Sequence, residues 1–180
     1  INNAGIMYKS PVEEIDLDKW RRAIDVNLTA PLICTKSVLP YMKKNKWGRI
    51  INICSIFSFI GGETYSAYAA AKGGLLQLTK VWSNEVAGDG ITVNAICPGW
   101  VDTPMLAGFI QRIADIHNES LDQAINRIFT LVPQKRFINP QEIASIALFL
   151  GSDCAQSING AGIVIDTGMI ASMPRGFHRI

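Results

Sequence analysis

Short apolar and β-branched runs alternate along the chain with longer segments that have helical periodicity. The runs show no clean alternation of apolar and polar positions, which is typical of strands covered on both faces in a parallel sheet. Strands that alternate with helices indicate an α/β fold with a doubly wound parallel sheet. The predicted strands are 49–54, 91–96 and 162–166, and the predicted helices are 28–46, 68–86 and 140–150.

The segment 104–130 departs from this alternation. It carries two weakly amphipathic stretches, 109–116 and 121–129, between the end of a predicted strand and the next regular helix. In open α/β sheets, ligands bind beyond the carboxyl ends of the strands. The segment is therefore predicted to form a helical lid over a ligand site, with plain helical packing as the alternative.

Composition narrows the class of protein. The 180 residues fit a single domain, 1–180, and 17 Lys and Arg against 15 Asp and Glu give a net charge of +2. That balance argues against a nucleic-acid partner or a membrane-surface partner. No run approaches the roughly 18 apolar residues of a membrane span.

The cysteines and histidines suggest neither disulfides nor a metal site. The cysteine spacing matches no disulfide framework and no zinc motif, so buried, reduced thiols in a cytoplasmic protein are expected. His117 and His178 lack partners at metal-ligand spacing and are expected at the surface. The four cysteines are Cys34, Cys54, Cys97 and Cys154.

Three residues form a candidate proton-transfer site. Tyr68 and Lys72 are four residues apart, which places them on one face of a helix, and Ser55 directly follows a predicted strand. A nearby ammonium would lower the pKa of a tyrosine from about 10 and let it exchange protons near neutral pH. A serine hydroxyl could stabilise charge on the same substrate oxygen. Tyr68 and Lys72 alone would more often be an interfacial tyrosine and a solvated lysine.

The order of motifs along the chain makes the site far more specific. Ser55 lies 13 residues before Tyr68, and motifs flank the pair on both sides. Together they closely resemble the short-chain dehydrogenase/reductase superfamily over nearly the whole chain. The motifs are Asn2-Asn3-Ala4-Gly5, Asn27, Ser55, Tyr68-Ala69-Ala70-Ala71-Lys72, and Asn94-Ala95-Ile96-Cys97-Pro98-Gly99.

The resemblance implies a Rossmann-like fold and an NAD(P)-dependent oxidoreductase that moves a hydride between nicotinamide and a carbonyl or secondary alcohol, with NAD or NADP as cofactor. It makes Tyr68 the catalytic acid/base, with Lys72 lowering its pKa and binding the nicotinamide ribose. Ser55 would orient the substrate carbonyl. Asn27 would hold a water that links Lys72 to solvent, or it could be an ordinary helix cap.

The resemblance also assigns a cofactor cleft and a substrate pocket. Turn and capping roles are the alternatives for the cleft residues, and local packing is the alternative for the pocket residues. The cleft residues are Asn3, Ala4, Gly5, Pro98, Gly99, Val101 and Thr103, together with Tyr68 and Lys72. The pocket residues are Ser55, Phe57, Ser58, Gly62, Tyr65, Trp100 and Met105.

The substrate stays open between a sugar acid, a polyol and a hydroxy acid. Residues 58–62 look like gluconate dehydrogenases, whereas 94–101 look like 3-hydroxybutyrate dehydrogenases. In the latter group polar carboxylate-binding residues usually stand where this chain has Met7 and Phe57. One alternative is a 3-oxoacyl-thioester reductase. Another, from a different class, is a non-catalytic dinucleotide-binding sensor or an inactive fragment.

Relatives of this superfamily run to about 250 residues, within the usual single-domain range. The chain begins where their fourth strand ends, so the N-terminal strands, the Gly-rich turn and the residue that selects NAD or NADP are expected to lie upstream. The 180 residues alone are therefore expected to bind dinucleotide poorly. Gly73 and Gly74 lie inside a predicted helix, which favours close helix packing. The resemblance implies that such helices pair in a homodimer or tetramer.

Overall fold

The computed structural model describes residues 1–171, and within them a three-stranded parallel sheet forms the centre of the fold. The strands are β1 (Gly48–Ile53), β2 (Ile91–Pro98) and β3 (Gly162–Ile165), in the order β1-β2-β3. The register aligns Gly48 with Ile91 and Ala95 with Gly162. Every residue of β2 is buried, which explains why its sequence shows no alternation. The three predicted strands are confirmed, each to within two residues at either end.

The N-terminal residues add one further parallel bridge at the free edge of β1. The Asn2 backbone N–H donates to the Ile51 carbonyl at 2.8 Å, and its carbonyl accepts from the Ile53 N–H at 2.9 Å. The Asn2 side chain also donates to Asn52 Oδ1 at 2.7 Å. The turn at 3–5 therefore leaves the sheet beside the carboxyl end of β1.

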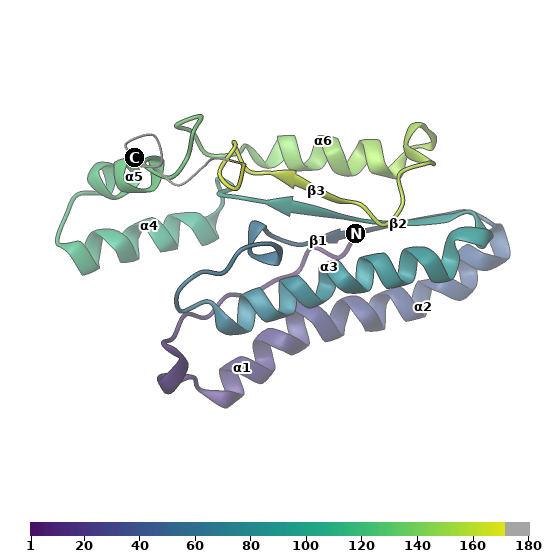
Figure 1. The fold of residues 1–180 in the computed structure, drawn as a ribbon, viewed down its shortest axis with the longest axis horizontal. Coiled ribbons are helices and arrows are strands. Elements are labelled where there is room, and N and C mark those ends of the chain that lie inside the picture. The colour runs from purple at the N-terminus through teal and green to yellow at the C-terminus, as the bar shows by residue number, and fades with distance from the viewer. Residues whose placement is uncertain (172–180) are drawn as a thin grey trace, which may run out of the picture.

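Helices cover both faces of the sheet, as a doubly wound fold requires (Figure 1). On one face lie α2 (Ala30–Asn45) and α3 (Ser66–Val86), and on the other lies α6 (Pro140–Gly151). Asn139 and Glu142 form the capping box that starts α6. Two apolar cores result, one between the sheet and the α2–α3 layer and one beneath α6.

The helix predicted at 28–46 is interrupted at its start. α1 (Leu17–Ile24), capped by Asp16, runs into a π-helical turn at Asp25–Thr29, and α2 follows directly. The wide turn leaves backbone groups to be satisfied by side chains, and such turns are frequent at functional sites. Asn27 lies in its middle.

Two helices lie beyond the carboxyl ends of the strands (Figure 1). They are α4 (Pro104–His117) and α5 (Leu121–Phe129), where the two amphipathic stretches were predicted. They share a separate apolar core, whose buried members include Leu106, Ala124 and Val132.

The two adjacent glycines of α3, Gly73 and Gly74, lie in different environments. A Cβ atom at Gly74 would lie 3.2 Å from the Leu28 side chain, so this glycine allows close helix packing. A Cβ atom at Gly73 would meet nothing within 4 Å. The packing explanation therefore holds for Gly74 only.

The cysteine prediction is half right. Cys54, directly after β1, and Cys97 in β2 are buried free thiols, but Cys34 and Cys154 are exposed. Both exposed residues lie on outward faces of helical segments, which spacing alone does not reveal. His117 is exposed as expected, and His178 lies outside the described residues. Residues 1–171 contain no group of three or more side chains placed to hold a metal ion.

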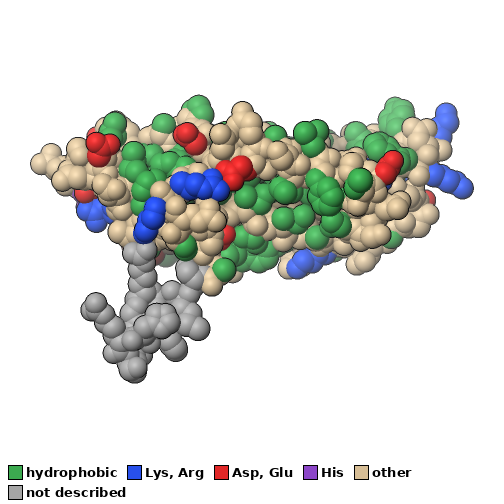
Figure 2. Space-filling model, turned by 90° about the horizontal axis from the view of Figure 1, so that it is seen from above, with side chains coloured by type: hydrophobic (Ala, Val, Ile, Leu, Met, Phe, Trp, Pro, Cys, Tyr) green, Lys and Arg blue, Asp and Glu red, His purple; other side chains and the backbone are tan. Residues whose placement is uncertain are grey.

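The surface seen from the α6 side carries a broad group of apolar side chains (Figure 2). Leu148 and Phe149 of α6 and Val164 of β3 are among the exposed apolar residues. None of the helices described here combines the length and the apolar character that crossing a bilayer demands.

Candidate active site

The predicted proton-transfer residues meet where β1 ends and α3 begins. Lys72 Nζ donates a hydrogen bond of 2.7 Å to the carbonyl of Ile53, the last residue of β1. The Ser58 hydroxyl donates to the Lys72 carbonyl at 2.9 Å and ties the short turn η3 (Ile56–Ser58) to α3. Ser55 caps that turn, with its Oγ accepting from the Phe57 N–H at 3.2 Å. These bonds hold Ser55 and α3 in one fixed arrangement.

Tyr68 lies next to Ser55, but its acidity differs from the expectation. Burial raises the pKa of Tyr68 above its ordinary value, and the hydrogen bond with Ser55 opposes that rise only in part. Lys72 Nζ lies 5.7 Å from the Tyr68 ring centre and contributes no resolved lowering. Burial therefore shifts the Tyr68 pKa in the direction opposite to the one expected from Lys72.

Lys72 is nearly inaccessible, at 3% exposure. Burial lowers its pKa, and the neighbouring Cys54 and Cys97 thiols oppose that change. An ammonium has three N–H donors, and the Ile53 carbonyl takes one of them. Lys72 can therefore hold additional hydroxyl or water oxygens on its remaining donors.

Asn27 fastens the chain after the 3–5 turn to the π-helical turn. Its Nδ2 donates to the carbonyls of Ile6 and Ala23, each at 2.8 Å, and its Oδ1 accepts from the Ile6 N–H at 3.2 Å. The helix-cap alternative is wrong, because Asn27 lies inside a helical turn and bonds across the chain.

The missing side chain of Gly5 lets the chain backbone lie close to Asn27 and Lys72. A Cβ atom at Gly5 would lie 3.0 Å from Asn27 Oδ1 and 3.7 Å from Lys72 Nζ. Any larger residue would crowd the Asn27 side chain beside a lysine with spare donors. Those spare donors of Lys72 fit a hydroxyl or water oxygen, as an NAD(P) site requires.

The other cleft residues lie at the end of β2. A Cβ atom at Gly99 would lie 3.1 Å from Asp166 Cβ, so this strand end packs closely against the segment after β3. The Thr103 hydroxyl donates to the Val101 carbonyl at 3.2 Å and does not cap α4. Val101 forms an isolated parallel bridge with Ile138. Asn3 and Ala4 are exposed beside Gly5, while Pro98 is buried at the end of β2.

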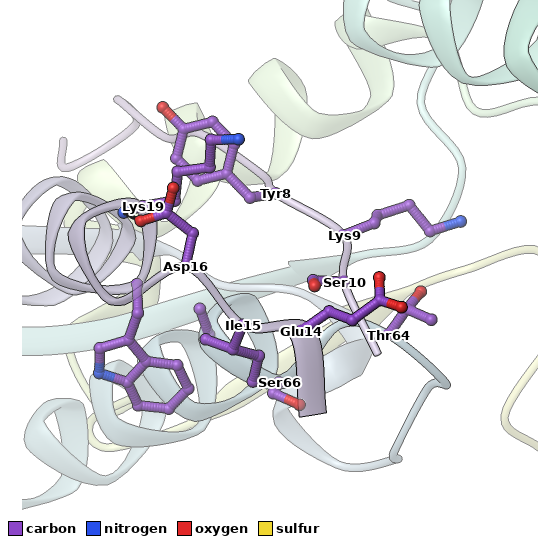
Figure 3. Close-up of a pocket in the computed structure, with 11 residues that line it drawn as sticks. Tyr8, Lys9, Ser10, Glu14, Ile15, Asp16, Lys19, Thr64 and Ser66 are labelled. Carbon is purple, nitrogen blue, oxygen red and sulfur yellow. Dashed lines mark hydrogen bonds between the residues drawn. The ribbon is translucent and has the colours of Figure 1, made fainter. Parts of the chain in front are cut away.

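Two cavities border this region. The smaller, of about 100 Å³, lies between the loop at 8–16 and the start of α3, and its lining includes Lys9, Asp16, Lys19 and Trp20 (Figure 3). The larger, of about 550 Å³, lies between residues 5–9 and α4 and begins at Gly5. Gly5 brings its lining close to the candidate proton-transfer site, because a Cβ atom at Gly5 would lie 3.7 Å from Lys72 Nζ.

One of the predicted substrate residues lines this larger cavity, and others contact its lining or one another. Met105 lines it directly. Trp100 stacks on the lining residue Phe109 with ring centres 4.8 Å apart. Phe57 stacks on Tyr65 at 4.5 Å, and its edge faces Tyr68 at 6.1 Å. A Cβ atom at Gly62 would lie 2.4 Å from the Phe57 ring, so Gly62 permits this stack.

Lys9 and Arg112 also line the larger cavity and were not predicted from the sequence. Each is a single basic residue with no motif around it. Only the approach of α4 to residues 5–9 brings them together. A basic residue soon after the Asn-Asn-Ala-Gly turn was the one available signal for Lys9.

Comparisons with known proteins agree with this geometry. A family model described as enoyl-(acyl carrier protein) reductase matches residues 1–170. An uncharacterized oxidoreductase of Bacillus subtilis, YxjF, is 45% identical over 95% of the chain and 67% of its own length. The D-beta-hydroxybutyrate dehydrogenase of Rhizobium meliloti is 40% identical with the same coverage.

A solved structure extends the likeness to the fold. A protein from Beutenbergia cavernae, assigned as an NAD(P)-dependent gluconate 5-dehydrogenase and crystallised with NADP at low occupancy, has a TM-score of 0.87. It is 36% identical over 95% of this chain and 65% of its own. The chain spans about two thirds of the length of these relatives. On sequence and fold together, the chain belongs to the short-chain dehydrogenase/reductase superfamily, whose members are NAD(P)-dependent oxidoreductases.

Proposed function

We propose that this chain carries the catalytic residues of an NAD(P)-dependent oxidoreductase that interconverts a secondary alcohol and a carbonyl compound. The convergence of Ser55, Tyr68 and Lys72 beside Gly5 carries this proposal. Sugar acids, polyols and hydroxy acids are the proposed substrates, in keeping with the relatives.

The nicotinamide supplies or accepts the hydride when it is bound. In the reducing direction, Tyr68 donates its phenolic proton to the substrate oxygen, and in the oxidising direction it accepts that proton. The Ser55 hydroxyl donates a hydrogen bond to the same oxygen and stabilises the charge that develops there.

Lys72 and Asn27 support the proton transfer. The free donors of Lys72 would hold a ribose hydroxyl of the cofactor, and a water held beside Asn27 would pass the proton on to solvent. Asn3, Ala4, Pro98, Gly99, Val101 and Thr103 complete the cofactor cleft, and α4 and α5 form the lid over it. Support comes from the positions of these segments, since residues 3–5 follow the bridge to β1, residues 98–103 lie at and after the end of β2, and α4 and α5 lie beyond the carboxyl ends of the strands (Figure 1).

A homo-oligomeric, cytoplasmic protein is part of the same proposal. Exposed apolar residues such as Leu148 and Tyr41 and the open space at Gly73 support association, while free thiols support a reducing compartment. Size-exclusion chromatography with light scattering tests the oligomer.

The activity is tested by following NAD(P)H formation or consumption by the full-length protein with a panel of alcohols, hydroxy acids and ketones. Hydride transfer that is lost in Tyr68→Phe supports the proposal. Cofactor binding without any hydride transfer would favour the alternative of a non-catalytic dinucleotide-binding sensor. Turnover of 3-oxoacyl thioesters alone would favour the alternative of a 3-oxoacyl-thioester reductase.

A further inference from the structure

We propose that the 550 Å³ cavity binds the carboxylate of an acidic substrate, and that Lys9 and Arg112 provide the anion site. This inference rests on the proposed oxidoreductase function and narrows its substrates to hydroxy acids and oxo acids.

The cavity has an unbalanced charge. Its lining within residues 1–171 holds two cations, Lys9 and Arg112, and no carboxylate, and the remaining side chains are mostly apolar. Neither cation belongs to any ion pair found among the described residues. Two neighbouring cations repel each other, as the lowering of the Lys9 pKa by burial and then by Arg112 also indicates. A bound anion would relieve that repulsion.

The amino group of Lys9 is held in place by aromatic rings. Its Nζ lies 4.6 Å from the ring centre of Tyr65 and 4.6 Å from that of Phe109. Each contact is a cation–π interaction, which positions the ammonium without neutralising it. Lys9 also lines the smaller cavity together with the carboxylates of Glu14 and Asp16, but no ion pair found among the described residues joins it to either one, and Figure 3 shows its side chain extending away from Asp16. The charge of Lys9 is therefore available to a ligand.

A series of aromatic contacts connects this ammonium to the proton donor. The Tyr65 ring, which Lys9 Nζ contacts, stacks on Phe57, and Phe57 makes a T-shaped contact with Tyr68. An anion at Lys9 is thus separated from the Tyr68 hydroxyl by two aromatic side chains. A substrate that reaches both carries its carboxylate and its reacting alcohol or ketone on different carbon atoms.

Lys9 could instead serve only to join α3 to α4 through its two aromatic contacts. The two roles predict different kinetics. Loss of a structural contact would impair acidic and neutral substrates alike, whereas loss of an anion site would raise KM for the acid alone.

The test uses the full-length protein with NAD(P) and two matched pairs, D-3-hydroxybutyrate with its neutral amide and gluconate with glucitol. Lys9→Met and Arg112→Gln are each expected to raise KM about tenfold to a hundredfold for whichever acid is oxidised. KM for the neutral partner should stay unchanged, and Lys9→Arg should restore the acid preference. Lys19→Met, a loss of charge in the smaller cavity, is the matched control. If Lys9→Met and Arg112→Gln changed KM equally for an acid and its neutral partner, or did not change KM for the acid, the anion site would be overturned.

A binding measurement separates this inference from the proposed activity. After reductive methylation with ¹³C-formaldehyde, the Lys9 methyl signal, assigned by its absence in Lys9→Met, should shift on addition of D-3-hydroxybutyrate or gluconate. The amide and glucitol should not shift it. A shift of the Lys9 methyl signal without any turnover of these substrates would support the anion site and reject the proposed oxidoreductase activity. Turnover without an acid-specific shift would support the oxidoreductase activity and reject the anion site.

Discussion

The amino group of Lys72 donates a hydrogen bond to the carbonyl oxygen of Ile53, so the first turns of α3 are linked to the last residue of β1. This contact joins two segments that lie 19 residues apart. It places the proposed proton-transfer residues of a helix directly beside the serine that follows a strand. The side chain that would hold a ribose thus also holds the site together.

Replacing Tyr68 by Phe should reduce turnover by about 10² to 10⁴-fold, because the proton donor to the substrate oxygen is lost. The fold should persist, since the ring that packs against Phe57 is retained. Steady-state kinetics and circular dichroism check both points. Tyr41→Phe on the exposed side of α2 is the control. Near-normal turnover in Tyr68→Phe would remove Tyr68 from the reaction.

In the cofactor-free protein, the Tyr68 phenol should stay protonated up to a pH above about 10, because burial raises its pKa. Because the folded state favours the neutral phenol, Tyr68 stabilises the fold at high pH relative to a tyrosine of ordinary pKa. This contribution to the free energy of unfolding is complete below about pH 10 and is lost as the pH rises further. An ultraviolet difference titration of wild type against Tyr68→Phe measures this directly. A tyrosine that ionises below about pH 9 in wild type alone would contradict it.

Asn27→Ala should lower the free energy of unfolding by about 2–4 kcal/mol, because it removes the three hydrogen bonds of the buried Asn27 side chain to the backbone of Ile6 and Ala23. Urea denaturation gives the value. Asn126→Ala, at an exposed position of α5, serves as the comparison and should change stability little. Equal stabilities of the two variants would show that the Asn27 amide does not hold residues 5–9 in place.

The two adjacent glycines of α3 should respond differently to alanine. Gly73→Ala meets open space and should stabilise the helix by about 0.5–1 kcal/mol. Gly74→Ala brings a methyl group within 3.2 Å of Leu28, which removes that gain or reverses it. Thermal unfolding of both variants, with light scattering to follow association, checks the difference. A destabilised Gly73→Ala that also loses its oligomeric state would place Gly73 in a subunit contact.

Local signals explain most of what could be predicted. The strand at 91–96 is a continuous apolar run because β2 is buried on both faces, and Asn139 with Glu142 marks the start of α6 through a capping box. The proposed site residues also carry motif-level signals, since Tyr68 and Lys72 share a helix face and Ser55 ends a strand.

Long-range relationships explain what could not be predicted. The partners of Asn27 include Ile6, 21 residues away, so the π-helical turn has no sign in its own sequence. The acidity of Tyr68 depends on burial by the surrounding segments and not on its spacing from Lys72. Lys9 meets Arg112 only because α4 folds back over residues 5–9.

The separate apolar core of α4 and α5 has an evolutionary consequence. Because its buried residues pack mainly against one another, substitutions there need not disturb the core between the sheet and α3. Groups that recognise the substrate can thus diversify on α4 while the proton-transfer residues stay anchored to β1 and α3. The architecture lets one chemical step be retained while the range of accepted molecules changes.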